Sequence, residues 1–165
     1  DEPDFVLTER AVAEHRIKDY DAIAGEDPAT WRARFDLSNW TIFAAHSEGR
    51  QVGGAVVVFR SPGVDMLEGR DDLAVLWDIR VAPDVRGKGV GTALLRAAES
   101  GAAANGATSM KVETQNINVP ACRFYSRHGY ILHAAIPRAY PDFPDETQLL
   151  WYKALPSTNS PGSSR

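Results

Sequence analysis

A run of alternating glycines with two basic side chains is the part of this sequence best suited to chemistry. The segment Arg86 to Gly91, with the sequence RGKGVG, lies between a predicted strand and a predicted helix. Glycines there let the backbone turn tightly and bring its N–H groups close to a ligand. The start of the helix adds unpaired N–H groups and the positive end of its dipole. Because Arg86 and Lys88 add charge, the segment predicts a phosphate or pyrophosphate site.

The common nucleotide-binding loops do not fit this segment. A Walker A loop needs Ser or Thr directly after Gly-Lys, whereas Gly89 follows Lys88 and the next threonine is Thr92. A dinucleotide fingerprint needs Gly-x-Gly-x-x-Gly after the first strand, whereas several predicted strands precede this segment and its glycines occupy every second position. The predicted ligand is therefore a phosphate compound of another class.

A second group of chemically useful side chains lies on a predicted helix at residues 120–128. Asn118 is placed to cap this helix and Gly129 to end it. Helical spacing puts four residues on one face, namely Ala121, Phe124, Tyr125 and His128. From the helix alone, Tyr125 is either a core aromatic residue or a proton donor.

Together, the two segments resemble the GNAT acetyltransferase superfamily. The cofactor motif of that superfamily, Arg-x-x-Gly-x-Gly, is similar to Arg86, Gly89 and Gly91 after a strand ending in IRVAP. Its second motif is similar to residues 118–130 at matching spacing. The strings LWDIRV, VETQNINVPAC and LLWY further resemble the streptothricin acetyltransferase branch. The superfamily resemblance covers about residues 40–153, and the branch resemblance is concentrated in 76–133.

This resemblance implies an N-acetyltransferase that uses acetyl-CoA and transfers acetyl directly to a primary amine in a ternary complex. Backbone N–H groups of the central strand would polarise the thioester carbonyl. In the superfamily, the asparagine matching Asn118 bonds the pantetheine arm, and the tyrosine matching Tyr125 can protonate the departing thiolate. The expected cofactor-binding residues are Val81, Ala82, Arg86, Gly87, Lys88, Gly89, Val90, Gly91, Thr92, Asn118 and Tyr125.

Two carboxylates are candidates for the base that deprotonates the amine, directly or through water. Asp78 interrupts an otherwise apolar strand, where an unpaired buried carboxylate would be costly. It is therefore a catalytic base or a structural partner of Arg80 or Arg86. Glu113 points away from the face of Val112 on the next central strand, which in this superfamily borders the acceptor site. It is a base, a substrate anchor or a surface carboxylate.

Further acids cluster in a proline-rich loop near the end of the sequence. Asp142, Asp145 and Glu146, near Tyr140, match the loop that covers the acceptor in the superfamily. Several acids around an aromatic ring would suit a polyamine-like or β-lysyl amine, although such a loop is also commonly just solvated. Cys122, the single cysteine, is expected to pack in the core and not to act as a nucleophile.

The elements that position these residues alternate between strand and helix. Strands are predicted at 5–10, 40–46, 51–60, 71–82, 109–115, 130–136 and 146–153. Helices are predicted at 11–24, 28–35, 90–104 and 120–128, the third from an apolar stripe of Val90, Ala93, Leu94 and Ala97. Residues 1–155 are expected to form one domain, and the Ser/Pro/Gly-rich residues 156–165 a disordered tail.

The resemblance implies a mixed α/β (α+β) fold of GNAT type. We expect a twisted, mostly antiparallel sheet of about seven strands, flanked by about four helices. The two central parallel strands would splay apart to admit the cofactor arm. The strand predicted at 71–82 has apolar residues on both faces, which favours a central position in the sheet.

Composition narrows the class of protein. The chain has 165 residues, of which 44% are hydrophobic and 24% charged, as in an ordinary globular domain. A net charge of −4 without long charge runs indicates no nucleic-acid partner. No stretch approaches the ~20 apolar residues that span a bilayer. The start lacks a signal-peptide pattern, so we expect a cytoplasmic protein without membrane contact. The four histidines show no metal-ligand spacing.

The sequence leaves the acceptor open. A small-molecule amine such as a streptothricin-like antibiotic is the leading prediction, and a protein amino group or a polyamine is the alternative. A non-catalytic acetyl-CoA sensor and a general phosphate-ligand module are the readings from other classes. Dimers are common in the superfamily, so a homodimer is compatible with the resemblance.

Overall fold

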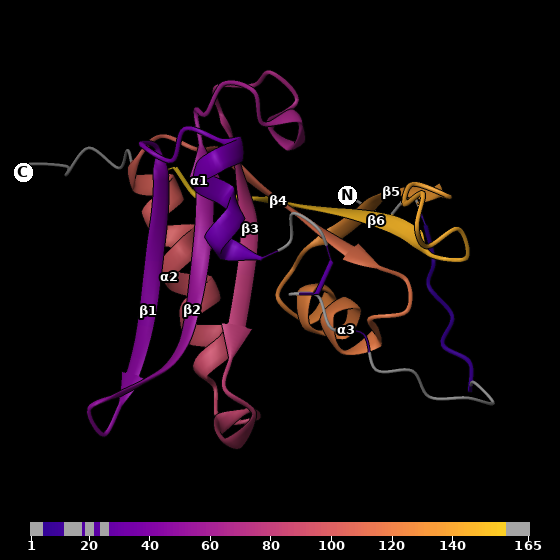
Figure 1. Ribbon diagram of the computed structural model, residues 1–165, viewed down its shortest axis with the longest axis horizontal. Helices are drawn as coiled ribbons and strands as arrows, with labels where there is room; N and C mark the ends of the chain where they lie inside the picture. Colours follow the sequence, from indigo (N-terminus) through magenta and orange to yellow (C-terminus); the bar gives the residue numbers. More distant parts are fainter. Residues whose placement is uncertain (1–4, 12–17, 19–21, 24–26, 158–165) are drawn as a thin grey trace, which may run out of the picture.

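A computed structural model of the protein describes residues 5–11, 18, 22–23 and 27–157. Through these residues runs one six-stranded sheet in the order β1-β2-β3-β4-β6-β5 (Figure 1). The strands are β1 (Trp40–Ser47), β2 (Arg50–Phe59), β3 (Leu73–Val81), β4 (Ser109–Gln115), β5 (Ile131–Pro137) and β6 (Thr147–Ala154). The α-helices are α1 (Trp31–Arg34), α2 (Val90–Ala104) and α3 (Val119–Arg127), with 3₁₀ turns η1 (Pro28–Thr30), η2 (Asp65–Leu67) and η3 (Pro83–Val85). The predicted mixed α/β class is confirmed.

The central strands β3 and β4 run parallel and separate along their length. Their ladder holds three pairs, Leu73↔Ser109, Ala74↔Met110 and Val75↔Lys111, although β3 continues to Val81. The other neighbouring strands pair in antiparallel fashion. Beyond the three pairs the sheet opens into one half made of β1–β3 and another made of β4–β6, as Figure 1 shows. The predicted splay of the central parallel strands is therefore confirmed.

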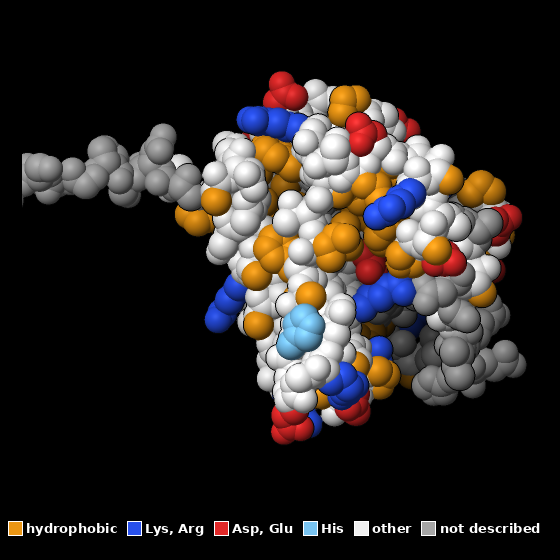
Figure 2. All heavy atoms as spheres, turned by 60° about the vertical axis from the view of Figure 1, so that its left-hand side comes forward, with side chains coloured by type: hydrophobic (Ala, Val, Ile, Leu, Met, Phe, Trp, Pro, Cys, Tyr) orange, Lys and Arg blue, Asp and Glu red, His pale blue; other side chains and the backbone are white. Residues whose placement is uncertain are grey.

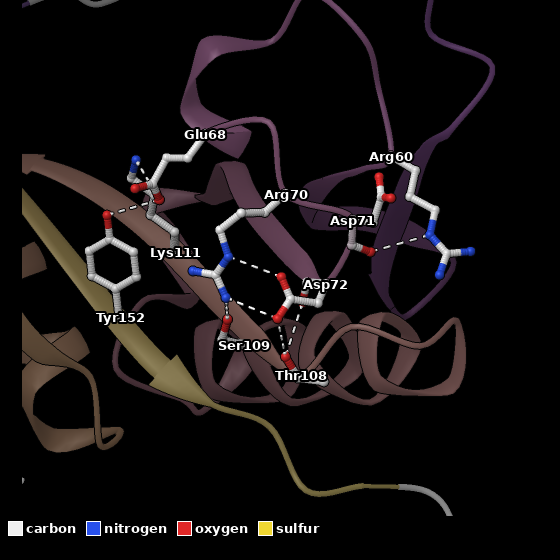
Figure 3. Close-up of polar contacts among 9 residues, drawn as sticks. All are labelled: Arg60, Glu68, Arg70, Asp71, Asp72, Thr108, Ser109, Lys111 and Tyr152. Carbon is white, nitrogen blue, oxygen red and sulfur yellow. Dashed lines mark hydrogen bonds and ion pairs between the residues drawn. The ribbon is translucent and has the colours of Figure 1, made fainter.

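Polar side chains join β3 to β4 at the paired end (Figure 3). Arg70 donates to both carboxylate oxygens of Asp72, at 3.0 and 3.1 Å, and to the Ser109 hydroxyl at 3.3 Å. Thr108 donates its hydroxyl to the Asp72 carboxylate at 2.9 Å and its N–H to the Asp72 carbonyl at 2.8 Å. The Arg70 hydrogen bond is the main cause that lowers the pKa of Asp72 to about 2. These contacts hold the two halves together where their ladder begins.

A buried lysine ties the loop before β3 to the other half of the sheet. Lys111 on β4 is 4% exposed, and its ammonium donates to the Met66 carbonyl at 3.1 Å. It also lies 3.4 Å from the carboxylate of Glu68, which accepts from the Tyr152 hydroxyl at 3.1 Å (Figure 3). The loop thus bridges the two halves at the closed end and leaves the diverging end free.

The larger core lies between the sheet and α2. The helix has the bounds that the sequence predicted, but its buried face differs from the predicted stripe. Ala93 and Ala97 are exposed, so that part of the stripe is wrong. The helix lies across the sheet with an adjacent face inward, and that face consists of Leu94, Leu95, Ala98, Ala102 and Ala103.

An aromatic cluster covers the opposite face of β2 and β3. It consists of Trp31, Phe35, Trp40 and Trp77, with ring centroids 5.2 to 6.4 Å apart. The predicted helix start is confirmed, since the Asp27 carboxylate accepts from the Ala29 N–H at 2.9 Å. Trp31 and Phe35 both pack against Trp40 and Trp77. This cluster gives the sheet a second apolar layer, so β2 and β3 are covered on both faces along this stretch.

The N-terminal strand prediction is wrong. Residues 5–11 have no ladder partner in the described chain, and Phe5, Val6 and Leu7 are exposed. Because these apolar side chains stay exposed, the segment has no buried face that would hold it in the sheet. Glu9 instead forms an ion pair with Arg123 on α3. The helix predicted at 11–24 and the tail predicted at 156–165 fall mostly outside the described residues.

Charge is mixed on the face of the molecule around β1. Figure 2 shows acidic and basic side chains interspersed on the face around β1. This arrangement fits the small net charge of −4.

None of the helices in the described part of the chain has both the length and the apolar composition for crossing a bilayer.

Candidate active site

The turn between β3 and α2 presents its backbone to open space. Gly87 and Gly89 have φ angles of 77° and 85°, in the left-handed region where other residues are strained. A Cβ added at either position would meet no atom within 4 Å. Packing therefore does not require glycine here, and the turn conformation does. The space beside this backbone is available to a ligand.

The N-terminus of α2 has donors to offer that ligand. Gly89 is the N-cap residue and no side chain caps the helix. The first intrahelical bond runs from the Ala93 N–H to the Gly89 carbonyl at 3.0 Å. The N–H groups of residues 90–92 consequently have no partner within the helix. This donor set fits a pyrophosphate, which accepts several N–H bonds and favours the positive helix end.

The basic residues of the turn differ in their placement. Arg86 donates Nε to the Val81 carbonyl at 3.2 Å, which folds its side chain back along the end of β3. A guanidinium carries further N–H groups, so this contact does not exhaust its donors. Lys88 is exposed. Both charges lie in the segment that the sequence predicted to bind an anion.

A contact that the sequence did not predict joins the cofactor turn to α3. Thr92 Oγ1 and His128 Nε2 are 3.0 Å apart, and His128 Nδ1 lies 2.7 Å from the Phe124 carbonyl. Because Nδ1 faces a carbonyl, it carries the proton and Nε2 accepts from the threonine hydroxyl. A Cβ on Gly91 would touch the Phe124 ring at 3.5 Å. The N-terminus of α2 and α3 are thus in direct contact.

Helix α3 carries the two residues of the second predicted motif. Asn118 caps it as predicted, since its side-chain oxygen accepts from the Ala121 N–H at 3.3 Å. Tyr125 is 4% exposed and packs edge-on against Phe124 and Tyr130, with centroids 5.3 and 5.4 Å away. Burial, and secondarily the negative charge of Asp78, raise the pKa of Tyr125. The phenol is therefore protonated at neutral pH.

A bulge in β3 determines where Asp78 points. Val57 pairs with Leu76 and Val56 with Asp78, which leaves Trp77 as an extra residue. Leu76 belongs to the core beneath α2, whereas Trp77 packs with the aromatic cluster on the opposite face. Beyond the bulge, Ile79 returns to the α2 side. The extra residue therefore puts Trp77 and Asp78 on the same face of the sheet, away from α2.

Asp78 has a basic partner on its own strand. Its carboxylate accepts from Arg80 Nε at 2.9 and 3.1 Å. Of the two arginines considered for it, Arg80 therefore pairs with it, whereas Arg86 reaches Val81. The Asp78 side chain is 24% exposed, so it lies at the edge of the opening and not deep in the core.

Glu113 lies on the corresponding face of β4. Its neighbour Val112 is in the core beneath α2, so Glu113 projects to the other side, as predicted. One carboxylate oxygen accepts from the Tyr140 hydroxyl at 2.5 Å and the other from the Gln148 amide at 2.9 Å. Tyr140 also accepts from the Gln115 amide at 3.3 Å. Burial first, and then the bond to Glu113, raise the pKa of Tyr140.

The fold thus brings most of the predicted residues to one opening. Asp78 and Glu113 share a face on the two diverging strands, and the Tyr125 hydroxyl is close enough to Asp78 to feel its charge. Of the three loop acids, Glu146 is buried, whereas Asp142 and Asp145 are exposed.

Two other predictions concern cysteine and metal ligands. Cys122 is buried with its sulfur 3.5 Å from Thr114 Oγ1, and burial raises the pKa of the thiol. These contacts are those of a packed side chain. Within the described ranges, no group of three or more acidic, histidine or cysteine side chains is arranged to hold a metal ion.

Comparison with known proteins supplies the family. Residues 9–130 match the model of the Acetyltransferase (GNAT) family. The chain belongs to this family. GNAT acetyltransferases use acetyl-CoA, whose pyrophosphate the turn between β3 and α2 fits. The two sequence motifs and the splayed strands therefore belong to one established fold.

Curated GNAT relatives of this chain include streptothricin acetyltransferases. Streptothricin acetyltransferase A of Bacillus subtilis (strain 168) is 44% identical over 81 residues, or 48% of this chain and 47% of that protein. Streptothricin acetyltransferase of Streptomyces lavendulae is 27% identical over 152 residues, which is 92% of this chain and 76% of that one. The match thus spans about half the length of the Bacillus relative.

Solved GNAT structures share the architecture. A nourseothricin acetyltransferase superposes with a TM-score of 0.63 at 30% identity, over 73% of this chain and 68% of that one. A putative streptothricin acetyltransferase from Bacillus anthracis str. Ames, in complex with acetyl coenzyme A, gives a TM-score of 0.63 at 25% identity, over 76% and 68%. The fold of the described chain is therefore the GNAT fold, and a related structure holds the family's cosubstrate.

Proposed function

We propose that the protein transfers acetyl from acetyl-CoA to a primary amine of a small molecule by direct attack in a ternary complex. The observation that carries the proposal is the opening between β3 and β4. It separates a cofactor turn at the end of β3 from a face that bears Asp78 and Glu113. The streptothricin acetyltransferases among the relatives favour a cationic, streptothricin-like acceptor. The cytoplasmic location and the homodimer stay predictions from the sequence.

Backbone groups of the turn and of β3 would hold the cosubstrate. The N–H groups of residues 87–92 would bind the pyrophosphate, and the pantetheine arm would run past Val81 and Ala82. The Ala82 N–H already donates to the Val52 carbonyl at 2.8 Å, and the carbonyls of Val81 and Ala82 accept from Arg86 and Val85, so the Val81 N–H would serve the arm. Asn118 uses its oxygen as the cap and retains its amide N–H groups. When bound, acetyl-CoA supplies an activated acetyl thioester.

Glu113 is the stronger candidate for the base. Its carboxylate accepts from two neutral donors, Tyr140 and Gln148. Asp78 instead accepts from the guanidinium of Arg80, so its carboxylate is already engaged by a positive charge. In this assignment Glu113 takes the proton from the incoming ammonium, directly or through water. Asp78 would attract that ammonium to the mouth of the opening.

Tyr125 would serve the leaving sulfur. Its hydroxyl has no hydrogen-bond partner among the described residues, although its ring is well packed. Because its pKa is raised, the hydroxyl is protonated over the whole neutral range. It is therefore available to donate to the developing thiolate, the group that needs stabilisation as the thioester bond breaks.

Thiol release from acetyl-CoA tests this proposal. The acceptors would be streptothricin, a polyamine, a lysine-containing peptide and a simple alkylamine. We expect amine-dependent release, fastest with the cationic small molecules, and intersecting initial-rate plots as direct transfer requires. Faster acetylation of the peptide would move the acceptor class to proteins. Tight CoA binding without release by any amine would contradict an enzymatic function and favour a sensor.

A further inference from the structure

One ammonium group of the chain itself lies in an acidic, aromatic site beside the loop after β5. Lys18 Nζ is 2.6 Å from Glu146 Oε2 and 4.0 Å from the centroid of the Phe143 ring. It is 5.9 Å from the centroid of the Tyr140 ring. The Lys18 and Glu146 side chains are only 17% and 10% exposed. A carboxylate combined with aromatic rings recognises an ammonium by charge and by cation–π attraction.

This site adjoins the proposed base. Tyr140, whose ring faces Lys18, donates its hydroxyl to Glu113. Two backbone bonds of 3.0 Å, from Phe143 N–H to the Tyr140 carbonyl and from Glu146 N–H to the Phe143 carbonyl, fold the loop into successive turns. These turns bring the two rings and the carboxylate to one place. A single tyrosine side chain therefore connects the ammonium site to the carboxylate that would deprotonate the acceptor.

The lysine comes from far away in the sequence, which makes the pairing informative. Lys18 and Glu146 are 128 residues apart. Because Glu146 is buried, its charge needs a cation to offset the loss of water. Any alkylammonium of suitable reach meets that need as well as a lysine does. Lys18 thus has the same chemical group as an amine acceptor and lies next to the acceptor face.

We propose that Glu146, Phe143 and Tyr140 form a subsite for the second, non-reacting ammonium of a di- or polyamine acceptor. Lys18 fills this subsite until the acceptor displaces it. The inference rests on the proposed function, since it assigns the reacting amine of the same acceptor to Glu113. It names the acceptor class as a molecule with two alkylammonium groups joined by a short carbon chain.

A matched pair of acceptors, 1,5-diaminopentane and 1-aminopentane, tests the subsite. The variants are Glu146→Gln and Lys18→Met, with Phe143→Leu as a milder change to the same site. Lys153→Met is the control, because it breaks another Lys–Glu pair of similar burial, Lys153 with Glu99 at 3.0 Å. Steady-state KM values for both amines, and calorimetric binding of each amine to the CoA-loaded enzyme, are the readouts.

The two main variants should act in opposite directions. We expect Glu146→Gln to raise the KM for the diamine about tenfold or more while leaving kcat and the KM for the monoamine nearly unchanged, because a buried charge partner is lost. Phe143→Leu should raise the diamine KM by a smaller factor. Lys18→Met should lower the diamine KM, because the tethered competitor is gone. Lys153→Met should change neither KM.

Several outcomes would overturn the subsite. One is an equal change in KM for both amines in Glu146→Gln and Phe143→Leu; another is weaker diamine binding in Lys18→Met. Acetylation of both amines with equal KM by the wild type, and diamine binding insensitive to Glu146→Gln, would remove the subsite and leave the enzyme assignment intact. Diamine binding that is lost in Glu146→Gln and tightened in Lys18→Met, without any acetylation, would support the subsite and contradict the proposed function.

Discussion

The proposed cofactor side and the proposed acceptor side of this protein are built in different ways. On the cofactor side, the turn and the helix start come from one continuous segment, and Arg86 contacts Val81, five residues away. On the acceptor side, Glu113 meets Tyr140 across 27 residues, and Lys18 meets Glu146 across 128. A local segment can fix the geometry of backbone donors by itself. A set of side chains from distant segments depends on the register of the whole sheet.

The two sides also use different kinds of groups. The cofactor turn offers backbone N–H groups, which every sequence possesses once the turn conformation is formed. The acceptor side offers carboxylates and aromatic rings, each held by a partner side chain. Recognition of a common cosubstrate therefore depends on conformation, whereas recognition of a particular amine depends on residue identity. The following changes test this division.

Replacing the acceptor-side carboxylates should have the largest effect. We expect Glu113→Gln to lower kcat by about 10²- to 10³-fold, the range for loss of a general base. Asp78→Asn should mainly raise the KM for a cationic acceptor, since its carboxylate is already paired with Arg80. Steady-state kinetics over a range of pH separates the two. If Asp78→Asn lowered kcat more than Glu113→Gln does, Asp78 would be the base and Glu113 the residue that attracts the acceptor.

Tyr125→Phe should have the next largest effect, because Tyr125 lies where the two sides meet. We expect kcat to fall about 10²-fold and the Kd for CoA to stay within a factor of two, since the donor acts on the developing thiolate. Tyr130→Phe is the control: it removes another buried hydroxyl, one that donates to Glu99 at 3.0 Å. That control should lower stability and leave kcat intact. Full activity of Tyr125→Phe across pH would remove its assigned role.

Gly89→Ala tests the backbone character of the cofactor side. Gly63 has nearly the same φ, 83° against 85°, and neither glycine has an atom within 4 Å of an added Cβ. Both Ala variants should lose roughly 1–2 kcal/mol of unfolding free energy from the left-handed conformation. Only Gly89→Ala should also raise the KM for acetyl-CoA, by about tenfold, since its methyl group intrudes on the anion site. Equal KM values in both variants would place the pyrophosphate elsewhere.

Asp72→Asn should have the smallest effect on activity and a distinct pH signature in stability. The pKa of Asp72 is lowered from 3.8 to about 2 in the fold. Its carboxylate therefore contributes stability above about pH 4, and this contribution is lost as the pH falls towards 2. Thermal melts should show a lower Tm for the variant at pH 7 and convergence with the wild type between about pH 4 and 2. A difference in Tm that does not change with pH would mean that the substitution acts through packing and not through the charge of the carboxylate.

Local patterns in the sequence predicted much of this fold. The bounds of α2, the Asn118 cap and the central position of β3 follow from nearby residues. The strand predicted at residues 5–10 was wrong, because a short apolar run forms a strand only where a neighbouring strand can pair with it and a sheet face can bury it. The α2 stripe was partly wrong because the sheet beneath, and not the helix period, decides which face is buried.

The candidate site divides in the same way. The spacing of the glycines predicted the anion-binding turn. The family resemblance predicted that Asn118 and Tyr125 also contact the cofactor. The contact of Thr92 with His128, 36 residues away, could not be predicted, since neither residue carries a local signal for the other. The contact of Lys18 with Glu146 could not be predicted from the sequence either, for the same reason. Glu146 was one of three acids in its loop, and only the fold distinguishes it by burial.

The extra residue Trp77 has a consequence for how the protein can change over generations. The side chains of β3 alternate between the two faces of the sheet before and after the bulge. Because of the bulge, each side chain after it lies on the opposite face from the one that unbroken alternation would give it. If β3 kept its length but paired with β2 without the bulge, Asp78 and Arg80 would turn under α2, and Ile79 and Val81 would face the other side. Single substitutions along β3 can therefore accumulate, whereas loss of the bulge at unchanged length would invert the second half of the strand. Descendants of this chain should therefore keep the bulge, or lose it together with its extra residue, more strictly than they keep the identities of the residues along β3.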